Sequence, residues 1–307
     1  MSEPGQSTSP RADDEVFWRT VAAYYDRPEG VIQLENGNWG AMARPVLDTY
    51  LEAVRRVNRD TSYYARRGMG RDLLAAREAT ARLLGVDPGE IAMTRNATEA
   101  MKALIGGYAK LQPGDGVLYA DLDYDSMQDC CEGLVKRRGV SVVRIAIPEP
   151  TTYQGLIDTY DAALRANSHV RLILLTHLSH RTGLVMPVRE IVAMARQRNV
   201  DVVVDAAHSV GQLDFRLPDL GADFVGLNLH KWIGAPLGVG AVYVRNGRAA
   251  DIEPDLASKH DAANDLQAIV HTGTVHFAAQ LTLPEAIAFT ARVDVKARAA
   301  RLRYLRD

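Results

Sequence analysis

The chain has 307 residues, and its 36 lysines and arginines nearly balance 38 aspartates and glutamates, giving a net charge of −2. This length is enough for one large α/β domain or two small ones. The absence of a basic excess argues against nucleic acid or an anionic membrane as a partner, and no apolar run is long enough to span a bilayer. The two cysteines, Cys130 and Cys131, are adjacent, which excludes a disulfide framework and predicts no metal site.

Residues 1–15 are polar and contain serine, proline and glycine. This composition predicts a disordered N-terminal tail. The tail has no apolar segment of the kind found in signal peptides, so a cytoplasmic location is expected.

The rest of the chain alternates between helical and extended patterns, which implies crossover units and an α/β fold with a mostly parallel sheet. Helices are predicted at residues 16–25, 45–58, 71–84, 95–110, 125–138, 158–166, 188–198 and 278–307. Strands are predicted at residues 90–94, 116–120, 140–147, 172–176, 202–205, 224–229 and 238–245.

Two predicted strands end in residues that can bind a ligand or take part in catalysis. Val202 to Val204 lead into Asp205, and the run from Phe224 leads into His230 and Lys231. Ligands of open α/β sheets bind at the carboxyl ends of strands. A lysine and an acid there suit pyridoxal phosphate (PLP), because the lysine amine forms a Schiff base with the aldehyde and the carboxylate keeps the pyridine nitrogen protonated. A simple surface Lys–Asp pair is the alternative.

A second candidate site lies where the predicted strand at 90–94 meets the next helix. The amides near Ala97 and Thr98, with the Thr98 hydroxyl, could bind an anion such as a phosphate at the positive end of the helix. The alternative is that Asn96 or Thr98 only caps the helix.

Residues 63–70 contain two tyrosines and two arginines before a pair of glycines. Arg66 and Arg67 are candidates for binding a substrate carboxylate, because arginine binds carboxylates through two parallel hydrogen bonds. A subunit-interface loop explains the same residues equally well, and the sequence leaves both interpretations open.

Residues 205–208 (Asp-Ala-Ala-His) and 228–232 (Asn-Leu-His-Lys-Trp) resemble motifs of class V aminotransferase-fold PLP enzymes in the cysteine desulfurase-like superfamily. The resemblance is closer to the isopenicillin N epimerase-like branch, and it extends from about residue 36 to the end of the chain. It implies a PLP-dependent transferase fold of type I. Residues 46–307 would form the PLP-binding large domain, and residues 16–45 a segment that borders the active site.

The resemblance also implies roles for individual residues. Lys231 is expected to be catalytic, and Asn38 and Trp39 to border the substrate pocket. Expected cofactor contacts are Ala97, Thr98 and His230 at the phosphate, Tyr124 stacked on the pyridine ring, Asp205 at its nitrogen and His208 beside its 3′-oxygen. His180 is expected to contact the 3′-oxygen or the substrate. Desulfurases carry asparagine at the position of His180.

Residues 271–274 (His-Thr-Gly-Thr) resemble the family segment that reaches the phosphate of the neighbouring subunit. Thr274 would then serve the partner's site, so a homodimer is expected. Relatives continue into a C-terminal small domain that usually supplies an arginine for the substrate carboxylate, and this chain is expected to lack that domain. Some relatives are exported by the twin-arginine route, which makes a periplasmic or secreted location the alternative if a leader has been removed.

Two functions follow from these features. The first is a PLP-dependent enzyme acting at the α-carbon of a small amino-acid-like substrate, as an epimerase, an aminotransferase or a lyase. The second is a non-catalytic binding or scaffold protein that retains the fold. The intact set of Asp205, His208, His230 and Lys231 favours the enzyme. A persulfide-forming desulfurase is disfavoured, since the only cysteines precede the region where its nucleophile is expected.

Overall fold

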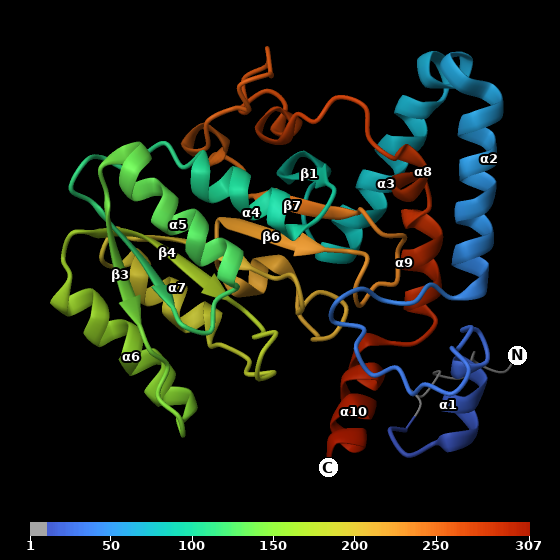
Figure 1. The fold of residues 1–307 in the computed structure, drawn as a ribbon, viewed down its shortest axis with the longest axis horizontal. Coiled ribbons are helices and arrows are strands. Elements are labelled where there is room, and N and C mark those ends of the chain that lie inside the picture. The colour runs from blue at the N-terminus through green and yellow to red at the C-terminus, as the bar shows by residue number, and fades with distance from the viewer. Residues whose placement is uncertain (1–10) are drawn as a thin grey trace, which may run out of the picture.

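The computed structural model describes residues 11–307 and consists of a central sheet with helices on both faces (Figure 1). The strands, in chain order, are β1 (Ile91–Thr94), β2 (Gly116–Ala120), β3 (Ser141–Ile145), β4 (Val170–Thr176), β5 (Asp201–Asp205), β6 (Phe224–Asn228) and β7 (Gly240–Val244). They are arranged in the sheet as β1-β7-β6-β5-β4-β2-β3.

The α-helices are α1 (Glu15–Ala22), α2 (Arg44–Arg67), α3 (Met69–Leu84), α4 (Ala97–Gly106), α5 (Asp125–Arg138), α6 (Tyr153–Ala166), α7 (Val188–Arg196), α8 (Phe277–Leu281), α9 (Leu283–Ala291) and α10 (Val295–Arg306). Short 3₁₀ segments lie at Pro88–Glu90, Leu217–Leu220, Ala249–Asp251 and Leu266–Val270. Within residues 11–307, no helix combines the length and apolarity needed to cross a membrane.

The sheet is mostly parallel, as predicted. Strands β3, β2, β4, β5 and β6 run in the same direction, and β7 lies antiparallel between β1 and β6. Thr176 at the end of β4 pairs with Asp205 at the end of β5. The segments that follow β2, β4, β5 and β6 therefore emerge at one edge of the sheet, where α/β proteins bind ligands.

Successive strand residues contribute to opposite faces of the sheet. In β5, Val202 and Val204 belong to the core shared with α3, α6, α7 and α9, whereas Val203 belongs to the core shared with α4 and α5. All three side chains are at most 4% exposed. Burial of each stabilises the fold by roughly 1.5–3 kcal/mol relative to exposure, which explains why an uninterrupted apolar run occupies this central strand.

The predicted disordered tail falls partly outside the described residues, which begin at Arg11. From Arg11 onwards the chain packs against the C-terminal helix. Asp14 caps α1, and Arg301 of α10 donates to the Ala12 carbonyl at 2.9 Å. Structure therefore begins before the end of the predicted tail at residue 15.

Helix α2 is longer than the predicted helix at 45–58. It continues through a kink at Thr61, where φ is 42°, as far as Arg67. Tyr64 is 5% exposed, and its hydroxyl donates to Asp72 of α3 at 2.8 Å. Packing onto α3 thus keeps residues 63–67 helical, so the alternative that placed a loop there is wrong as to its conformation. Its suggested position at a subunit interface stays a prediction.

We predict that His177, directly after β4, makes stability fall in acid. Its ring packs edge-on against Phe215 at 4.8 Å, and burial lowers the pKa of His177 to about 4. The unfolded chain takes up a proton near pH 6.5 that the folded chain excludes, so stability is lost as the pH falls from 6.5 to 4. This residue should cost about 3 kcal/mol by pH 4.

Urea unfolding of wild type and His177→Phe at pH 7 and pH 4 measures this contribution. The variant should lose less stability in acid than wild type, whereas a His260→Gln control, at an exposed position, should follow wild type. Identical pH dependence in His177→Phe and wild type would contradict the assignment.

Candidate active site

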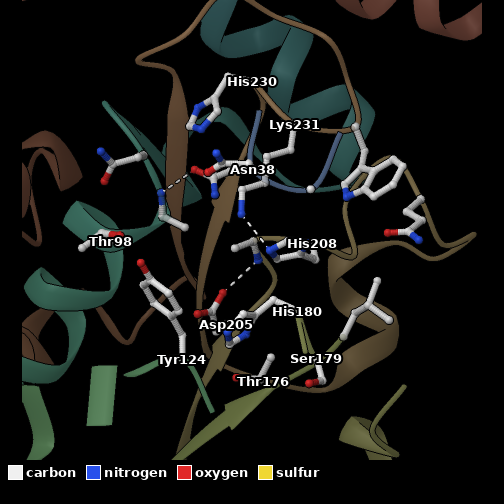
Figure 2. Close-up of a pocket in the computed structure, with 18 of the residues that line it drawn as sticks. Asn38, Thr98, Tyr124, Thr176, Ser179, His180, Asp205, His208, His230 and Lys231 are labelled. Atoms are coloured by element: carbon white, nitrogen blue, oxygen red, sulfur yellow. Dashed lines mark hydrogen bonds between the residues drawn. The ribbon is translucent and has the colours of Figure 1, made fainter. Parts of the chain in front are cut away.

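A cavity of about 680 Å³ opens at the carboxyl edge of the sheet. Its walls come from the segments that follow β1, β2, β4, β5 and β6, together with residues of the long N-terminal segment before α2. Figure 2 shows the polar side chains that meet there. Five separate stretches of sequence are thus brought to one place by the parallel strands.

Lys231, which follows β6, projects its amine into this cavity (Figure 2). Its Nζ lies 2.7 Å from Nε2 of His208. Burial lowers the pKa of Lys231, although the charge of Asp205 opposes this effect. Burial, together with Lys231 and His180, lowers the pKa of His208 to about 4. A neutral His208 can therefore accept a hydrogen bond from Lys231 and fix the position of its amine.

Asp205, the last residue of β5, lies at the floor of the cavity and is 4% exposed. Burial raises the pKa of this carboxyl, while the Ala207 amide, which donates to Oδ1 at 2.9 Å, and the charge of Lys231 oppose the rise. A buried carboxylate is costly unless it is paired with a positive charge. The site therefore favours a ligand that presents a cationic group to Asp205.

The N-terminus of α4 forms another wall of the cavity. The first amides of a helix lack intrahelical acceptors, and two of them are satisfied by side chains. The Ala97 amide donates to Asn228 at 2.8 Å, and the Glu99 amide donates to Asn96 at 2.8 Å. Thr98, between them, also lines the cavity, and its amide and hydroxyl are groups that suit an anionic ligand.

His230 precedes the lysine and lines the same cavity. Its Nδ1 lies 2.9 Å from the Val239 carbonyl. Since a carbonyl only accepts, Nδ1 carries the hydrogen and Nε2 is available to a ligand. Burial lowers the pKa of His230, which keeps the ring neutral.

Two aromatic rings form the wall opposite the lysine loop. Tyr124, which follows β2, is 41% exposed and lines the cavity. Its ring meets that of His180 edge-on, with centroids 5.3 Å apart and an interplanar angle of 87°. His180 in turn lies 6.2 Å from the ring of His208. The exposed face of Tyr124 is therefore available for stacking on a flat ligand.

Glycines let the N-terminal segment lie directly on the lysine loop. The Gly40 amide donates to the His230 carbonyl at 2.8 Å. A Cβ atom at Gly40 would lie 1.9 Å from the Lys231 carbonyl oxygen, and one at Gly37 would lie 3.1 Å from the His208 ring. Only glycine at position 40 permits this contact.

The C-terminal helices support the lysine loop from the other side. The Thr290 hydroxyl of α9 donates to the Ile233 carbonyl at 2.9 Å. The Arg298 guanidinium of α10 donates to the Trp232 carbonyl at 3.2 Å. The backbone that carries the lysine is thus held between the N-terminal segment and the last two helices.

Most residues expected at the site line this cavity: Asn38, Ala97, Thr98, Tyr124, His180, Asp205, His208, His230 and Lys231. Four expected site residues do not line this cavity: Trp39, Arg66, Arg67 and Thr274. Trp39 is 54% exposed, and Arg66 and Arg67 are exposed at the end of α2. Neither arginine therefore reaches this cavity to bind a carboxylate.

Thr274 is exposed and follows a segment that lines a separate cavity of about 350 Å³. Its expected contact with a neighbouring subunit stays a prediction. Within residues 11–307, no three histidine, cysteine, aspartate or glutamate side chains come together in a way that could hold a metal ion.

Asn228 and Asp123 both organise the site, although the sequence pattern assigns neither of them a role. Asn228 fixes the start of α4 through Ala97. Asp123 is 2% exposed and lies under the wall that carries Tyr124. Each stands at or just after the end of a buried strand, which is the only signal that could have identified it.

The fold and the cavity define an α/β protein with a candidate ligand site at the carboxyl edge of a mostly parallel sheet. The chain belongs to the aminotransferase class-V family, whose model matches residues 43–307. It is 30% identical over 293 residues to isopenicillin N epimerase of Streptomyces clavuligerus, covering 90% of this chain and 73% of the relative. It is also 30% identical over 291 residues to putative L-cysteine desulfhydrase 1 of Oryza sativa subsp. japonica, covering 89% of this chain and 60% of the relative.

Solved structures share the fold. The cysteine desulfurase CsdA of Escherichia coli superposes with a TM-score of 0.77 at 19% identity, covering 92% of this chain and 73% of that one. A mutant of C-DES with glycine covalently linked to its PLP cofactor superposes with a TM-score of 0.75 at 20% identity, covering 86% of this chain and 72% of that one. These identities support a shared fold and nothing finer.

We predict that Gly40→Ala destabilises the protein, because its Cβ would overlap the Lys231 carbonyl oxygen. Overpacking of this kind costs about 1–3 kcal/mol. Gly133→Ala in α5 is the matched control, since nothing lies within 4 Å of the added methyl group. In a helix this control should raise stability by up to about 1 kcal/mol. Urea unfolding of both variants measures the two effects, and a neutral Gly40→Ala would refute the close contact.

Proposed function

We propose that the protein is a PLP-dependent enzyme that acts at the α-carbon of an amino acid or a similar amine. The observation that carries this proposal is the placement of Lys231 and Asp205 in one cavity, with the amide end of α4 as a further wall. Membership of the aminotransferase class-V family supports it, as does the PLP cofactor of the structurally similar C-DES.

The cavity residues fit PLP at each of its functional groups. Lys231 would attach the cofactor covalently through Nζ. Asp205 would pair with the pyridine nitrogen, which offsets the cost of burying its carboxyl. Thr98 and His230 would bind the phosphate at the start of α4, and Tyr124 would stack on the ring.

The remaining expected contacts complete this arrangement. His180 and His208 would lie near the 3′-oxygen, as the resemblance implies, and Ala97 and Asn38 would border the cofactor and the substrate. When bound, PLP supplies an electron sink for negative charge at the substrate α-carbon.

Lys231 also suits the role of general base. Burial lowers its pKa, which increases the neutral fraction of the amine near neutral pH. His208 holds the Lys231 amine at 2.7 Å and can orient it towards the α-carbon. Asp205 would meanwhile keep a proton on the ring nitrogen. Epimerase, aminotransferase and lyase activities all begin with such a proton removal, and relatives named as an epimerase and a desulfhydrase fit this common step.

We expect a covalent adduct on Lys231. Purified protein incubated with PLP should absorb visible light, and borohydride reduction should leave a pyridoxyl group on Lys231 that mass spectrometry locates. Lys231→Ala should form no adduct at this cavity, whereas Lys259→Ala, at an exposed position, should behave as wild type.

The same preparations test the chemistry. In deuterated water, wild type loaded with PLP should exchange the α-hydrogen of at least one member of an amino-acid panel, as seen by proton NMR, and Lys231→Ala should not. A wild type that takes up no PLP contradicts the proposal, and one that binds PLP at Lys231 without exchanging any substrate supports a binding protein instead.

The homodimer is also part of this proposal. Thr274 is exposed and lies outside the cavity that contains Lys231, a position from which it could serve a second copy. We predict a mass in solution of twice 33.7 kDa, measured by light scattering. If dilution yields a monomer and this monomer binds PLP with the same affinity as the dimer, Thr274 does not contribute to the partner's site.

A further inference from the structure

Asp123 lies directly before Tyr124, in the turn that joins β2 to α5. Its carboxyl group makes two backbone contacts. Oδ2 accepts a hydrogen bond from the Ala120 amide at 2.8 Å, and Oδ1 accepts one from the Thr176 amide at 2.7 Å. One side chain therefore ties the turn to the end of β4.

The backbone of Asp123 is fixed as well. Its amide donates to the Ala120 carbonyl at 3.1 Å, and its carbonyl accepts from Gln128 Nε2 at 2.7 Å. Four hydrogen bonds thus hold the residue that precedes Tyr124. Because only one peptide unit separates the two residues, this anchoring also restrains the backbone from which the Tyr124 side chain extends to the cavity wall.

The Asp123 carboxyl group lies just beyond the point where the backbone pairing between β2 and β4 ends. Their last paired residues are Leu118 and Ile173, whereas Ala120 and Thr176 lie beyond and are 2% and 6% exposed. Buried amides need acceptors, and the Asp123 carboxyl supplies both. An apolar side chain could fill the same space but would leave both amides without a partner.

Burial makes the charged form of the Asp123 carboxyl group unfavourable. Burial raises the pKa of Asp123 to about 7, and the nearby Asp205 adds to the rise. Asp121 in the same turn also accepts a backbone hydrogen bond, from the Ile147 amide at 3.0 Å. Its carboxyl group is exposed, so it does not incur the desolvation penalty of a buried carboxylate. A buried acid therefore occupies a position of the turn that contacts β4 and directly precedes Tyr124.

We propose that Asp123 is a positioning residue that holds the Tyr124 ring in place against the cofactor. This inference rests on the proposed binding of PLP. It assigns to Asp123 no contact with PLP or substrate, and its effect on the cofactor passes through Tyr124.

A double-mutant cycle tests this route. The PLP dissociation constant is measured by visible absorption for wild type, Asp123→Asn, Tyr124→Ala and the double variant. Asp123→Asn should raise the dissociation constant about three- to tenfold, the range expected when a ring contact is lost. It should also reduce the visible circular dichroism of each bound cofactor. The double variant should bind PLP no more weakly than Tyr124→Ala alone.

Two further variants keep the test decisive. Asp121→Asn is the matched control and should leave both the dissociation constant and the circular dichroism unchanged. If Asp123→Asn does not fold, Gln128→Met takes its place, because it removes the hydrogen bond to the Asp123 carbonyl, together with a longer one of 3.4 Å to the Asp121 carbonyl, and leaves the Asp123 carboxyl group intact. It should give a smaller effect in the same direction, again absent when Tyr124 is alanine.

An unchanged dissociation constant in the Asp123 variant overturns the inference. An equal effect with and without the Tyr124 ring also overturns it, since Asp123 would then act on the fold or on the charge of Asp205. Wild type is titrated first. If it binds no PLP, the proposed function falls together with the inference, whereas normal wild-type binding with additive variants removes the inference alone.

Discussion

Parallel pairing of β4, β5 and β6 is the constraint on which the cavity depends. The β-branched run in β5 packs on helices at both faces, so this strand has a fixed place at the centre of the sheet. Its register sets Asp205 beside Thr176 of β4 and beside Gly226 of β6. The loops that follow the neighbouring strands then emerge at the same edge, so Lys231 and Asp205 line one cavity although they are far apart in the sequence. The Lys231 amine also contacts His208 in the loop that follows Asp205.

The charges of the cavity are balanced for a ligand that is positive at one end and negative at the other. Burial disfavours the charged forms of four groups in the cavity: it raises the pKa of Asp205 and lowers those of Lys231, His208 and His230. A cationic ring nitrogen at Asp205 and a phosphate at the start of α4 would each meet the complementary charge. The cost of burying these groups is thus offset only when both ends of the ligand are present.

Sequence patterns predict the features that depend on interactions between neighbouring residues in the chain. The sequence predicts both the apolar run before Asp205 and a helix that begins near Ala97, because strand and helix signals are carried by neighbouring residues. The extension of α2 was missed, because it depends on the contact of Tyr64 with Asp72 in another helix. The anchoring role of Asp123 was missed for the same reason. The second amide that donates to its carboxyl group belongs to Thr176, which is 53 positions away in the chain.

The support of the lysine loop by the last two helices has a mechanical consequence. Thr290 and Arg298 bind the carbonyls of Ile233 and Trp232, the two residues that follow Lys231. A small tilt of α10 would therefore move the lysine backbone while leaving Asp205, which is fixed within the sheet, in place. The position of the Lys231 backbone thus depends on the packing of the last two helices, whereas the position of Asp205 depends on the sheet.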